Sequence, residues 1–437
     1  GYYAVLAMHS GEKKIIGTRN GSPLVVGLGE KENFLASDIP ALLEYTKQVQ
    51  YIHDHDFVVL DGETNTVNFY STETGEPIER QVHRVDWDME QAKKGDFDHY
   101  MMKEITEQVD TVKAAINQDK EELFHIAKHI KEAKGVFLVA CGSSYHACLT
   151  ASYLFSKVAK MHVNVVLGSE FSNYEHFLTP ETLVIFVSQS GETIDVLDAL
   201  RTARKKGSRV ISIVNVVGSS LYRDSDHNLL LNAGPEIGVL STKTYTSQLT
   251  VLSLLVYTVA DMYEKGKHEL ENLWNMIYNL TSANTREYVK KLAEMLQYKD
   301  HIFLIGRGLQ FPTALESALK IKEVSYIHAE GFSGGELKHG TIALIEEGTP
   351  CIVFSSTDTE KEIISNAMEI KARGGYIIGV NHNNNEVFDY FIKVPDVGDL
   401  NPVTQIIPMQ ILSYQLAVLR GADPDKPRNL AKSVTVK

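Results

Sequence analysis

Short apolar runs alternate with amphipathic stretches in the middle of the chain. The runs lie at 136–140, 163–167, 183–187 and 210–214, and the stretch at 194–206 has the apolar spacing of a helix. Buried strands separated by helices are typical of a parallel sheet with helical crossover connections. The pattern therefore predicts a doubly wound α/β domain in this part of the chain.

The same pattern occurs a second time. At the offset that takes Gly142 to Gly308, the segment V-I-S-I-V-N at 210–215 falls on Y-I-I-G-V-N, and a G-S-E segment falls on G-G-E. Several matches at one offset indicate a duplicated unit. We therefore expect two tandem doubly wound parallel-sheet domains, at 126–270 and 290–425.

The residues before them have a different pattern. Strand-like runs separated by G-S, D-G and T-G turn signals occur at 3–8, 22–26, 57–60 and 67–70. Because no helical stretches lie between these runs, we expect a separate β-rich piece at 1–85. The polar segment that follows, 86–125, is expected to be a linker and a helix beginning near Tyr100. The last segment, 426–437, is considered with the candidate site.

Composition and charge narrow the class of protein. The chain is 43% hydrophobic and 23% charged, as in ordinary globular proteins, and its net charge of −13 disfavours broad binding to nucleic acid or an anionic membrane. The longest apolar stretch, 249–260, is shorter than the ~18 residues of a membrane-spanning helix. We expect neither nucleic acid nor membrane as a partner. An anionic ligand would have to be held by loops and helix ends.

The cysteines and histidines suggest no metal site. The three cysteines, Cys141, Cys148 and Cys351, have neither metal-binding spacing nor the pattern of a disulfide framework. They indicate a reducing, cytoplasmic compartment. The H-D-H-D segment at 53–56 precedes a strand and is interpreted as a turn. We expect no metal and no cofactor.

A polar loop follows the apolar run at 183–187. It reads S-Q-S-G-E-T and places Ser188, Gln189, Ser190 and Thr193 directly before a helix. The N-terminus of a helix favours an anion, and ligands of α/β sheets bind beyond the carboxyl ends of the strands. An ordinary helix cap needs only one such residue. Four donors in six positions therefore predict a site for a monophosphate.

A second strand end carries similar residues. Ser143 and Ser144 follow the run at 136–140, and alone they are as consistent with a helix cap as with a site. Together with the S-Q-S-G-E-T loop, they are more consistent with ligands of a phosphate or a sugar. The equivalent loop of the second domain ends in Asp358, which would repel a phosphate. We expect the second copy to have lost the anion.

Ionisable residues gather in the second half of the chain. A helix predicted at 311–328 carries Glu316, Lys320 and Glu323 on one face. A solvated ion pair is the simpler interpretation of such a face. Apolar neighbours of Glu323 and the following glycine-rich segment with His339 favour a site instead.

The end of the chain offers an amine. A frayed tail is the ordinary expectation for a terminus. Leu430 and Ala431, flanked by Val434 and Val436, suggest instead that the tail docks. Lys432 would then be a desolvated amine able to attack a carbonyl group.

Together these motifs resemble a known family. C-G-S-S-Y, S-Q-S-G-E-T, E-I-G-V-L-S-T-K, G-E-L-K-H-G and P-R-N-L-A-K-S-V-T-V resemble the isomerase part of the glutamine–fructose-6-phosphate aminotransferases. That part consists of two sugar isomerase (SIS) domains. Residues 1–85 contain the segment N-G-S-P-L-V-V-G-L-G, which resembles the later part of the family's glutaminase domain. In the same piece, Asp38 resembles a residue of that domain that contacts glutamine. The resemblance implies synthesis of glucosamine 6-phosphate from fructose 6-phosphate, for amino-sugar biosynthesis, with ammonia from glutamine.

The resemblance also implies roles for single residues. The phosphate of fructose 6-phosphate would be held by Ser188, Gln189, Ser190 and Thr193, helped by Ser143 and Ser144. Val239 is implied as a backbone contact to the sugar, and Glu236, from the E-I-G-V-L-S-T-K motif, is placed with the substrate-binding residues. Lys432 would form a Schiff base at C2, and Lys320 would assist proton movement. Glu323 would be the base, and His339 would open the sugar ring from the neighbouring subunit of a homodimer.

One feature departs from the family. Its glutaminase uses an N-terminal cysteine, whereas residue 1 here is Gly and all three cysteines fall in the SIS domains. We therefore expect the chain to lack the glutaminase nucleophile. Another SIS enzyme, such as a phosphosugar isomerase or a deglycase, is one alternative function. A non-catalytic sugar-phosphate sensor is another, and Glu323, His339 and Lys432 together count against it.

Overall fold

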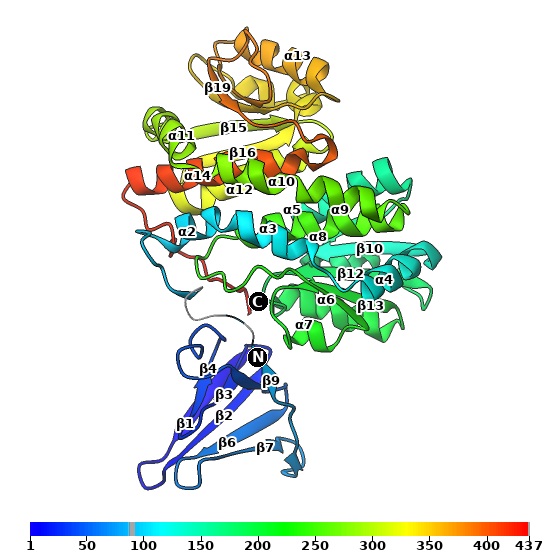
Figure 1. Cartoon of the computed structure of the whole chain (residues 1–437), viewed down its shortest axis with the longest axis vertical. Coiled ribbons are helices and arrows are strands. Elements are labelled where there is room, and N and C mark those ends of the chain that lie inside the picture. Colours follow the sequence, from blue (N-terminus) through cyan, green and yellow to red (C-terminus); the bar gives the residue numbers. More distant parts are fainter. Residues whose placement is uncertain (86, 88–91, 436–437) are drawn as a thin grey trace.

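Two parallel sheets and a β-rich piece make up the chain (Figure 1). The computed structural model describes residues 1–85, 87 and 92–435. Part of the expected linker and the last two residues, Val436 and Lys437, lie outside the described residues. The β-rich piece lies beside the first parallel sheet, and a layer of helices separates that sheet from the second. The predicted class, two tandem doubly wound domains after a β-rich piece, is confirmed.

The first parallel sheet has the strand order β11-β10-β12-β13-β14. Its strands are β10 (Gly135–Ala140), β11 (Asn164–Leu167), β12 (Thr182–Ser188), β13 (Arg209–Val214) and β14 (His227–Leu230). Strand β12 is buried along its whole length because helices cover both faces of the sheet. This explains why its sequence is a continuous apolar run.

The second sheet repeats this topology in the order β16-β15-β17-β18-β19. Its strands are β15 (His301–Gly306), β16 (His328–Ser333), β17 (Pro350–Phe354), β18 (Tyr376–Asn381) and β19 (Tyr390–Lys393). Gly142 and Gly308 follow the corresponding strands β10 and β15 with φ of 56° and 57°. That conformation is easily reached only by glycine, so the duplication predicted from the sequence extends to single backbone angles.

Helices between the two sheets join them through one apolar core. They include α5 (Gly142–Leu154), α8 (Lys243–Val259), α12 (Gln310–Ser325) and α14 (Asn401–Leu419). Leu138 of the first sheet and Leu304 of the second belong to the same continuous cluster of buried side chains. Every residue of α8 is buried, which accounts for the apolar stretch at 249–260. No helix in the described ranges is both long and apolar enough to cross a membrane.

The remaining helices cover the outer faces of the sheets or pack against the helices between them. They are α2 (Tyr100–Thr106), α3 (Gln108–Ile116), α4 (Lys120–Glu132), α6 (Ile194–Lys205), α7 (Ser220–Arg223), α9 (Tyr263–Glu271), α10 (Leu273–Leu280), α11 (Ala283–Leu296) and α13 (Glu360–Lys371). Short helical turns are η1 (Phe155–Ala159), η2 (Gly168–Phe177), η3 (Gly334–His339), η4 (Thr341–Leu344) and η5 (Gly398–Leu400). Helix α6 buries Val196, Leu197 and Leu200 against the first sheet, in keeping with its amphipathic spacing.

The β-rich piece consists of two antiparallel sheets, β1-β2-β6-β7-β8 and β4-β3-β5-β9. The strands are β1 (Tyr3–Met8), β2 (Lys14–Asn20), β3 (Val25–Leu28), β4 (Asn33–Ala36), β5 (Gln48–Tyr51), β6 (Asp56–Asp61), β7 (Thr66–Ser71), β8 (Pro77–Ile78) and β9 (His83–Arg84). Arg19 lies 3.5 Å from Glu192 in the loop that follows β12, and Tyr51 donates a hydrogen bond to the carbonyl of Val217. These contacts attach the piece to the first domain.

Two sequence-based boundaries were wrong. The helix predicted at 311–328 ends at Ser325, because Tyr326 adopts a left-handed conformation with φ of 61°, and His328 begins strand β16. The strand predicted at 22–26 begins at Val25 instead, after Pro23, which has no N–H for a sheet hydrogen bond.

Candidate active site

One cavity brings together all the candidate residues except His339. It has a volume of about 230 Å³ and lies at the carboxyl ends of β10 and β12. Its candidate residues are Ser143, Ser144, Ser188, Gln189, Ser190, Thr193, Glu236, Val239, Lys320, Glu323 and Lys432. His339 is exposed at the end of η3 and is absent from the described residues that line this cavity.

Two helices begin at this cavity without a side-chain cap. In the described chain, neither Cys141 before α5 nor Thr193 before α6 uses its side chain to cap the helix. Ser188 shapes the loop by accepting a hydrogen bond from the N–H of Gly191 at 3.0 Å. Gly191 has φ of 66°, and a Cβ there would lie 2.1 Å from the Ser219 hydroxyl oxygen. Both helix dipoles therefore favour an anion in the cavity.

Lys320 lies at the centre of a buried charge network. Its Nζ is 2.8 Å from Glu323 Oε2, 3.4 Å from Glu316 Oε1 and 3.0 Å from Ser143 Oγ. Burial opposes the charge of Lys320, but the two carboxylates outweigh it and raise the pKa of the amine above its ordinary value. Burial likewise opposes ionisation of Glu316, yet Lys320 and His146 hold its pKa below the usual range. The helix face predicted from i, i+4 spacing is thus an interior ion-pair network.

Lys432 is anchored in the cavity by polar contacts. Its Nζ donates to Glu236 Oε2 at 2.5 Å and to the carbonyl of Gly238 at 2.7 Å. The sequence did not predict that a carboxylate faces this amine, and that of Glu236 is fully buried. Burial opposes ionisation of Glu236, but Lys432 and the N–H groups of Thr242 and Thr244 hold its pKa below the ordinary value.

The C-terminal tail docks through its backbone. The carbonyl of Val434 accepts a hydrogen bond from the N–H of Ile194, the first residue of α6, at 3.0 Å. The carbonyl of Asp425 accepts one from Val239 at 3.1 Å, so the N–H of Val239 is already bonded to the tail. Docking was predicted from Leu430 and Val434, yet both stay about half exposed, at 45% and 54%. Polar contacts, not apolar burial, place the tail.

Glu104 on α2 is a buried acid that sequence reasoning missed. Its Oε1 accepts hydrogen bonds from the N–H groups of Ile237 at 2.5 Å and Gly238 at 3.1 Å, next to the carbonyl that binds Lys432. Burial and the charge of Glu236 raise the pKa of Glu104 to about 7. No local pattern marks this residue, because its partners are far away in the sequence.

We expect Glu104→Gln to flatten the pH dependence of stability. The folded state binds a proton at Glu104 up to about pH 7, whereas the ordinary pKa is 4.5, so wild-type stability falls as pH rises between these values. The shift corresponds to a loss of about 3 kcal/mol above pH 7. Urea unfolding at pH 5 to 8 measures it. Glu104→Gln should gain stability relative to wild type as pH rises, whereas Glu121→Gln, at an exposed position, should not. If the free energy of unfolding of Glu104→Gln varied with pH in parallel with that of wild type, the raised pKa of Glu104 would be refuted.

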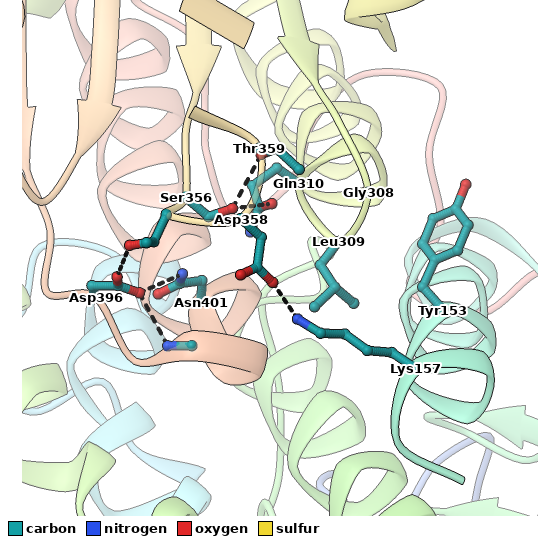
Figure 2. Close-up of a pocket in the computed structure, with 12 residues that line it drawn as sticks. Tyr153, Lys157, Gly308, Leu309, Gln310, Ser356, Asp358, Thr359, Asp396 and Asn401 are labelled. Carbon is teal, nitrogen blue, oxygen red and sulfur yellow. Dashed lines mark hydrogen bonds and ion pairs between the residues drawn. The ribbon is translucent and has the colours of Figure 1, made fainter. Parts of the chain in front are cut away.

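The second domain has a cavity at the equivalent place, also of about 230 Å³ (Figure 2). Asp358 and Asp396 line it, and Asp358 forms an ion pair with Lys157 of the first domain. Ser356 Oγ donates to Gln310 Oε1 at 2.9 Å. The polar groups that would correspond to the phosphate loop thus bind other parts of the chain. The loss of the anion in this copy stays a prediction.

A larger cavity adjoins the candidate site. It has a volume of about 520 Å³, and residues of the β-rich piece, among them Asp38, form one side of it. Gln189, Glu236 and Lys432 line both cavities. The two cavities therefore share a wall. The sequence did not predict this second space, because its two sides come from different domains.

The fold and the site define an SIS-domain protein: the SIS domain family matches residues 129–258 and 295–420. The C-terminal domain of glucosamine-fructose-6-phosphate aminotransferase from Francisella tularensis is a similar solved structure, with a TM-score of 0.71 and 33% identity. It covers 76% of this chain and 100% of its own. The aminotransferase of Thermococcus kodakarensis is 44% identical over all of this chain and 74% of its own length. That of Clostridium acetobutylicum is 41% identical over all of this chain and 75% of its own length.

The chain belongs to the glutamine–fructose-6-phosphate aminotransferase (isomerizing) family. The family resemblance expected from the motifs is confirmed over the whole chain.

Proposed function

We propose that the chain makes glucosamine 6-phosphate from fructose 6-phosphate and ammonia. One observation carries the proposal: a single cavity contains two uncapped helix N-termini, the Lys432 amine and the Lys320–Glu323 pair. A phosphate, a carbonyl carbon and a mobile proton each find a suitable group there. The names of the similar proteins support the same substrates.

The first chemical step would form a Schiff base at Lys432. Glu236, at 2.5 Å, is placed to take a proton from the ammonium group and free its lone pair. The amine then attacks C2 of the open-chain ketose, the carbonyl oxygen leaves as water, and a C=N bond forms. Ammonia adds to C2 and displaces the lysine, so that its nitrogen becomes the amino nitrogen of the product.

The second step would isomerise the sugar at Glu323. The carboxylate removes a proton from C1 while the imine nitrogen gains one, which gives an enol. The proton returns to C2, and the C1 hydroxyl loses its own proton to become the aldehyde. Lys320, 2.8 Å from Glu323, would polarise the substrate oxygen and assist these transfers.

Ammonia would arrive from the side of the β-rich piece. The larger cavity there shares Gln189, Glu236 and Lys432 with the candidate site. This supports a supply from the piece that resembles a glutaminase domain, although the reaction proposed here needs only ammonia itself.

An assay with ammonium chloride and fructose 6-phosphate tests the proposal. Mass spectrometry should detect glucosamine 6-phosphate that carries ¹⁵N from labelled ammonium. Formation of glucose 6-phosphate alone, with ammonium in excess, would favour the phosphosugar isomerase alternative. Binding of the sugar phosphate without turnover would favour the sensor.

We expect Thr193→Val to weaken substrate binding. The substitution keeps the shape of the side chain and removes a hydroxyl that is free of helix capping. Loss of one hydrogen bond to a charged phosphate should raise KM for fructose 6-phosphate about tenfold. Steady-state kinetics measure it. Thr202→Val, at the other end of α6, should leave KM unchanged; an unchanged KM for Thr193→Val would remove Thr193 from the phosphate site.

His339 is proposed to act in the cavity of a second subunit. Its exposed position at the end of η3, away from the cavity of its own chain, supports this. A mixture of His339→Asn and Lys432→Arg subunits, each inactive alone, should then regain about a quarter of the wild-type activity, because half of random dimers contain one intact site. Unfolding and refolding the mixture before the assay allows exchange. Activity equal to that of the separate variants would contradict the arrangement.

A further inference from the structure

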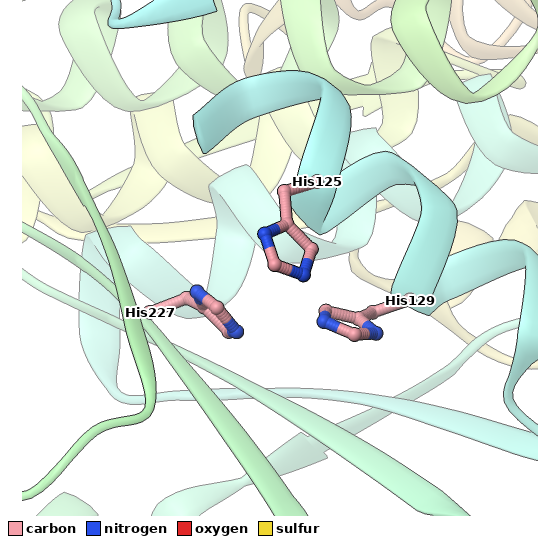
Figure 3. A group of neighbouring side chains, drawn as sticks. All are labelled: His125, His129 and His227. Carbon is pink, nitrogen blue, oxygen red and sulfur yellow. The ribbon is translucent and has the colours of Figure 1, made fainter. Parts of the chain in front are cut away.

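Three histidines form a cluster on the outer side of the first domain. His125 and His129 lie one turn apart on α4, and His227 is the first residue of β14. Their rings are turned toward one another (Figure 3). The ring centroids are 4.5 Å apart for His125 and His129, 4.8 Å for His125 and His227, and 5.1 Å for His129 and His227.

These spacings resemble those of a metal site. With metal–nitrogen distances of about 2.0–2.1 Å and tetrahedral angles, three coordinated imidazole rings have centroids about 5 Å apart. One ring nitrogen from each of the three histidines lies within 4.8 Å of the other two. Coordination would need these nitrogens about 3.4 Å apart. His125 is exposed and the other two are half-buried, so small ring rotations can close the difference.

Neighbouring side chains orient two of the rings. Glu122 Oε1 lies 3.0 Å from His227 Nδ1, so the carboxylate accepts the Nδ1–H and leaves a lone pair on Nε2. A carboxylate behind a histidine is a common support of a metal ligand. Arg209 can only donate, so His129 Nδ1 accepts its hydrogen bond and the ring carries its proton on Nε2. Binding of a metal at Nε2 requires the exposed Arg209 side chain to move away and the ring proton to shift to Nδ1.

We propose that His125, His129 and His227 bind a divalent transition-metal ion of the zinc class. Three imidazole ligands suit Zn²⁺ better than Mg²⁺ or Ca²⁺, which prefer oxygen. Water completes the fourth position. The ion would join α4 to the edge strand β14. None of the three histidines is among the described residues that line the candidate active-site cavity. The role of the bound ion would therefore be to stabilise the fold, not to take part in the reaction.

Metal retention by the untagged full-length chain tests the proposal. After incubation with Zn²⁺ and dialysis against metal-free buffer, elemental analysis should find one Zn²⁺ per chain. His129→Gln should weaken binding at least tenfold, and the triple variant with Gln at all three positions should retain none. His176→Gln, which changes a well-exposed histidine elsewhere, should behave as wild type.

Two further measurements separate a built site from surface binding. Co²⁺ in place of Zn²⁺ should give the intense visible absorption of tetrahedral coordination, and Zn²⁺ should raise Tm in wild type but not in the triple variant. Retention of Zn²⁺ by the triple variant would overturn the assignment, as would failure of wild type to retain it. A weak, octahedral-type Co²⁺ spectrum would show adventitious binding only and would also overturn it.

Discussion

Replacement of Lys432 by arginine should abolish synthesis of glucosamine 6-phosphate while leaving the site assembled. Arginine keeps the positive charge that faces Glu236 and can still donate to the carbonyl of Gly238. It stays protonated and cannot form a Schiff base. We expect kcat to fall at least a thousandfold, with KM for fructose 6-phosphate changed little.

The control for this experiment lies in the same tail. Lys426 is exposed, and Lys426→Arg should keep full activity. Borohydride added during turnover should link the sugar to Lys432 in wild type and in Lys426→Arg, and peptide mass spectrometry locates the link. A label on another lysine, or a loss of less than tenfold in Lys432→Arg, would exclude Lys432 as the amine.

Replacement of Glu323 by glutamine should stop the second step and spare the first. Glutamine has the same shape but cannot accept a proton at neutral pH, and Lys320 keeps Glu316 as a charged partner at 3.4 Å. General-base catalysis contributes about 10²–10⁴-fold, so we expect a loss of kcat within that range.

Two partial reactions make the assignment specific. Wild type should exchange the C1 hydrogen of the substrate with deuterium from the solvent, and Glu323→Gln should not. Borohydride trapping at Lys432 should remain in the variant. Glu330→Gln, which changes an exposed carboxylate on β16, should retain both reactions. Continued exchange in Glu323→Gln would assign the base elsewhere, and loss of trapping would mean that the substitution disrupts the whole cavity.

Local sequence patterns were sufficient to predict the parallel sheets and the position of the loop at 188–193. The buried run of β12, the S-Q-S-G-E-T loop and the start of α6 follow one another directly in the chain, and each has its own periodicity or turn chemistry. The duplication was visible for the same reason, since Gly142 and Gly308 need the same backbone conformation.

Contacts between distant segments were beyond such patterns. Glu104 is an ordinary helix residue in the sequence, and only the fold brings it to the N–H groups of Ile237 and Gly238. Lys432 was identified as an amine, but its pairing with Glu236 depends on how the tail docks. His227 joins His125 and His129 only because β14 runs beside α4. At each of these three places the partners of the side chain are set by the tertiary structure and not by the neighbouring sequence.

The apolar core shared by the two parallel sheets has a consequence for hydrogen exchange. Because Leu138 of the first sheet and Leu304 of the second belong to one continuous cluster with α8 and α14, neither domain can open without exposing the other's interior. Amide protons of α8 and α14 should therefore exchange at one common slow rate, set by the joint unfolding of both domains. Amides of the β-rich piece, which has separate cores, should exchange independently and faster.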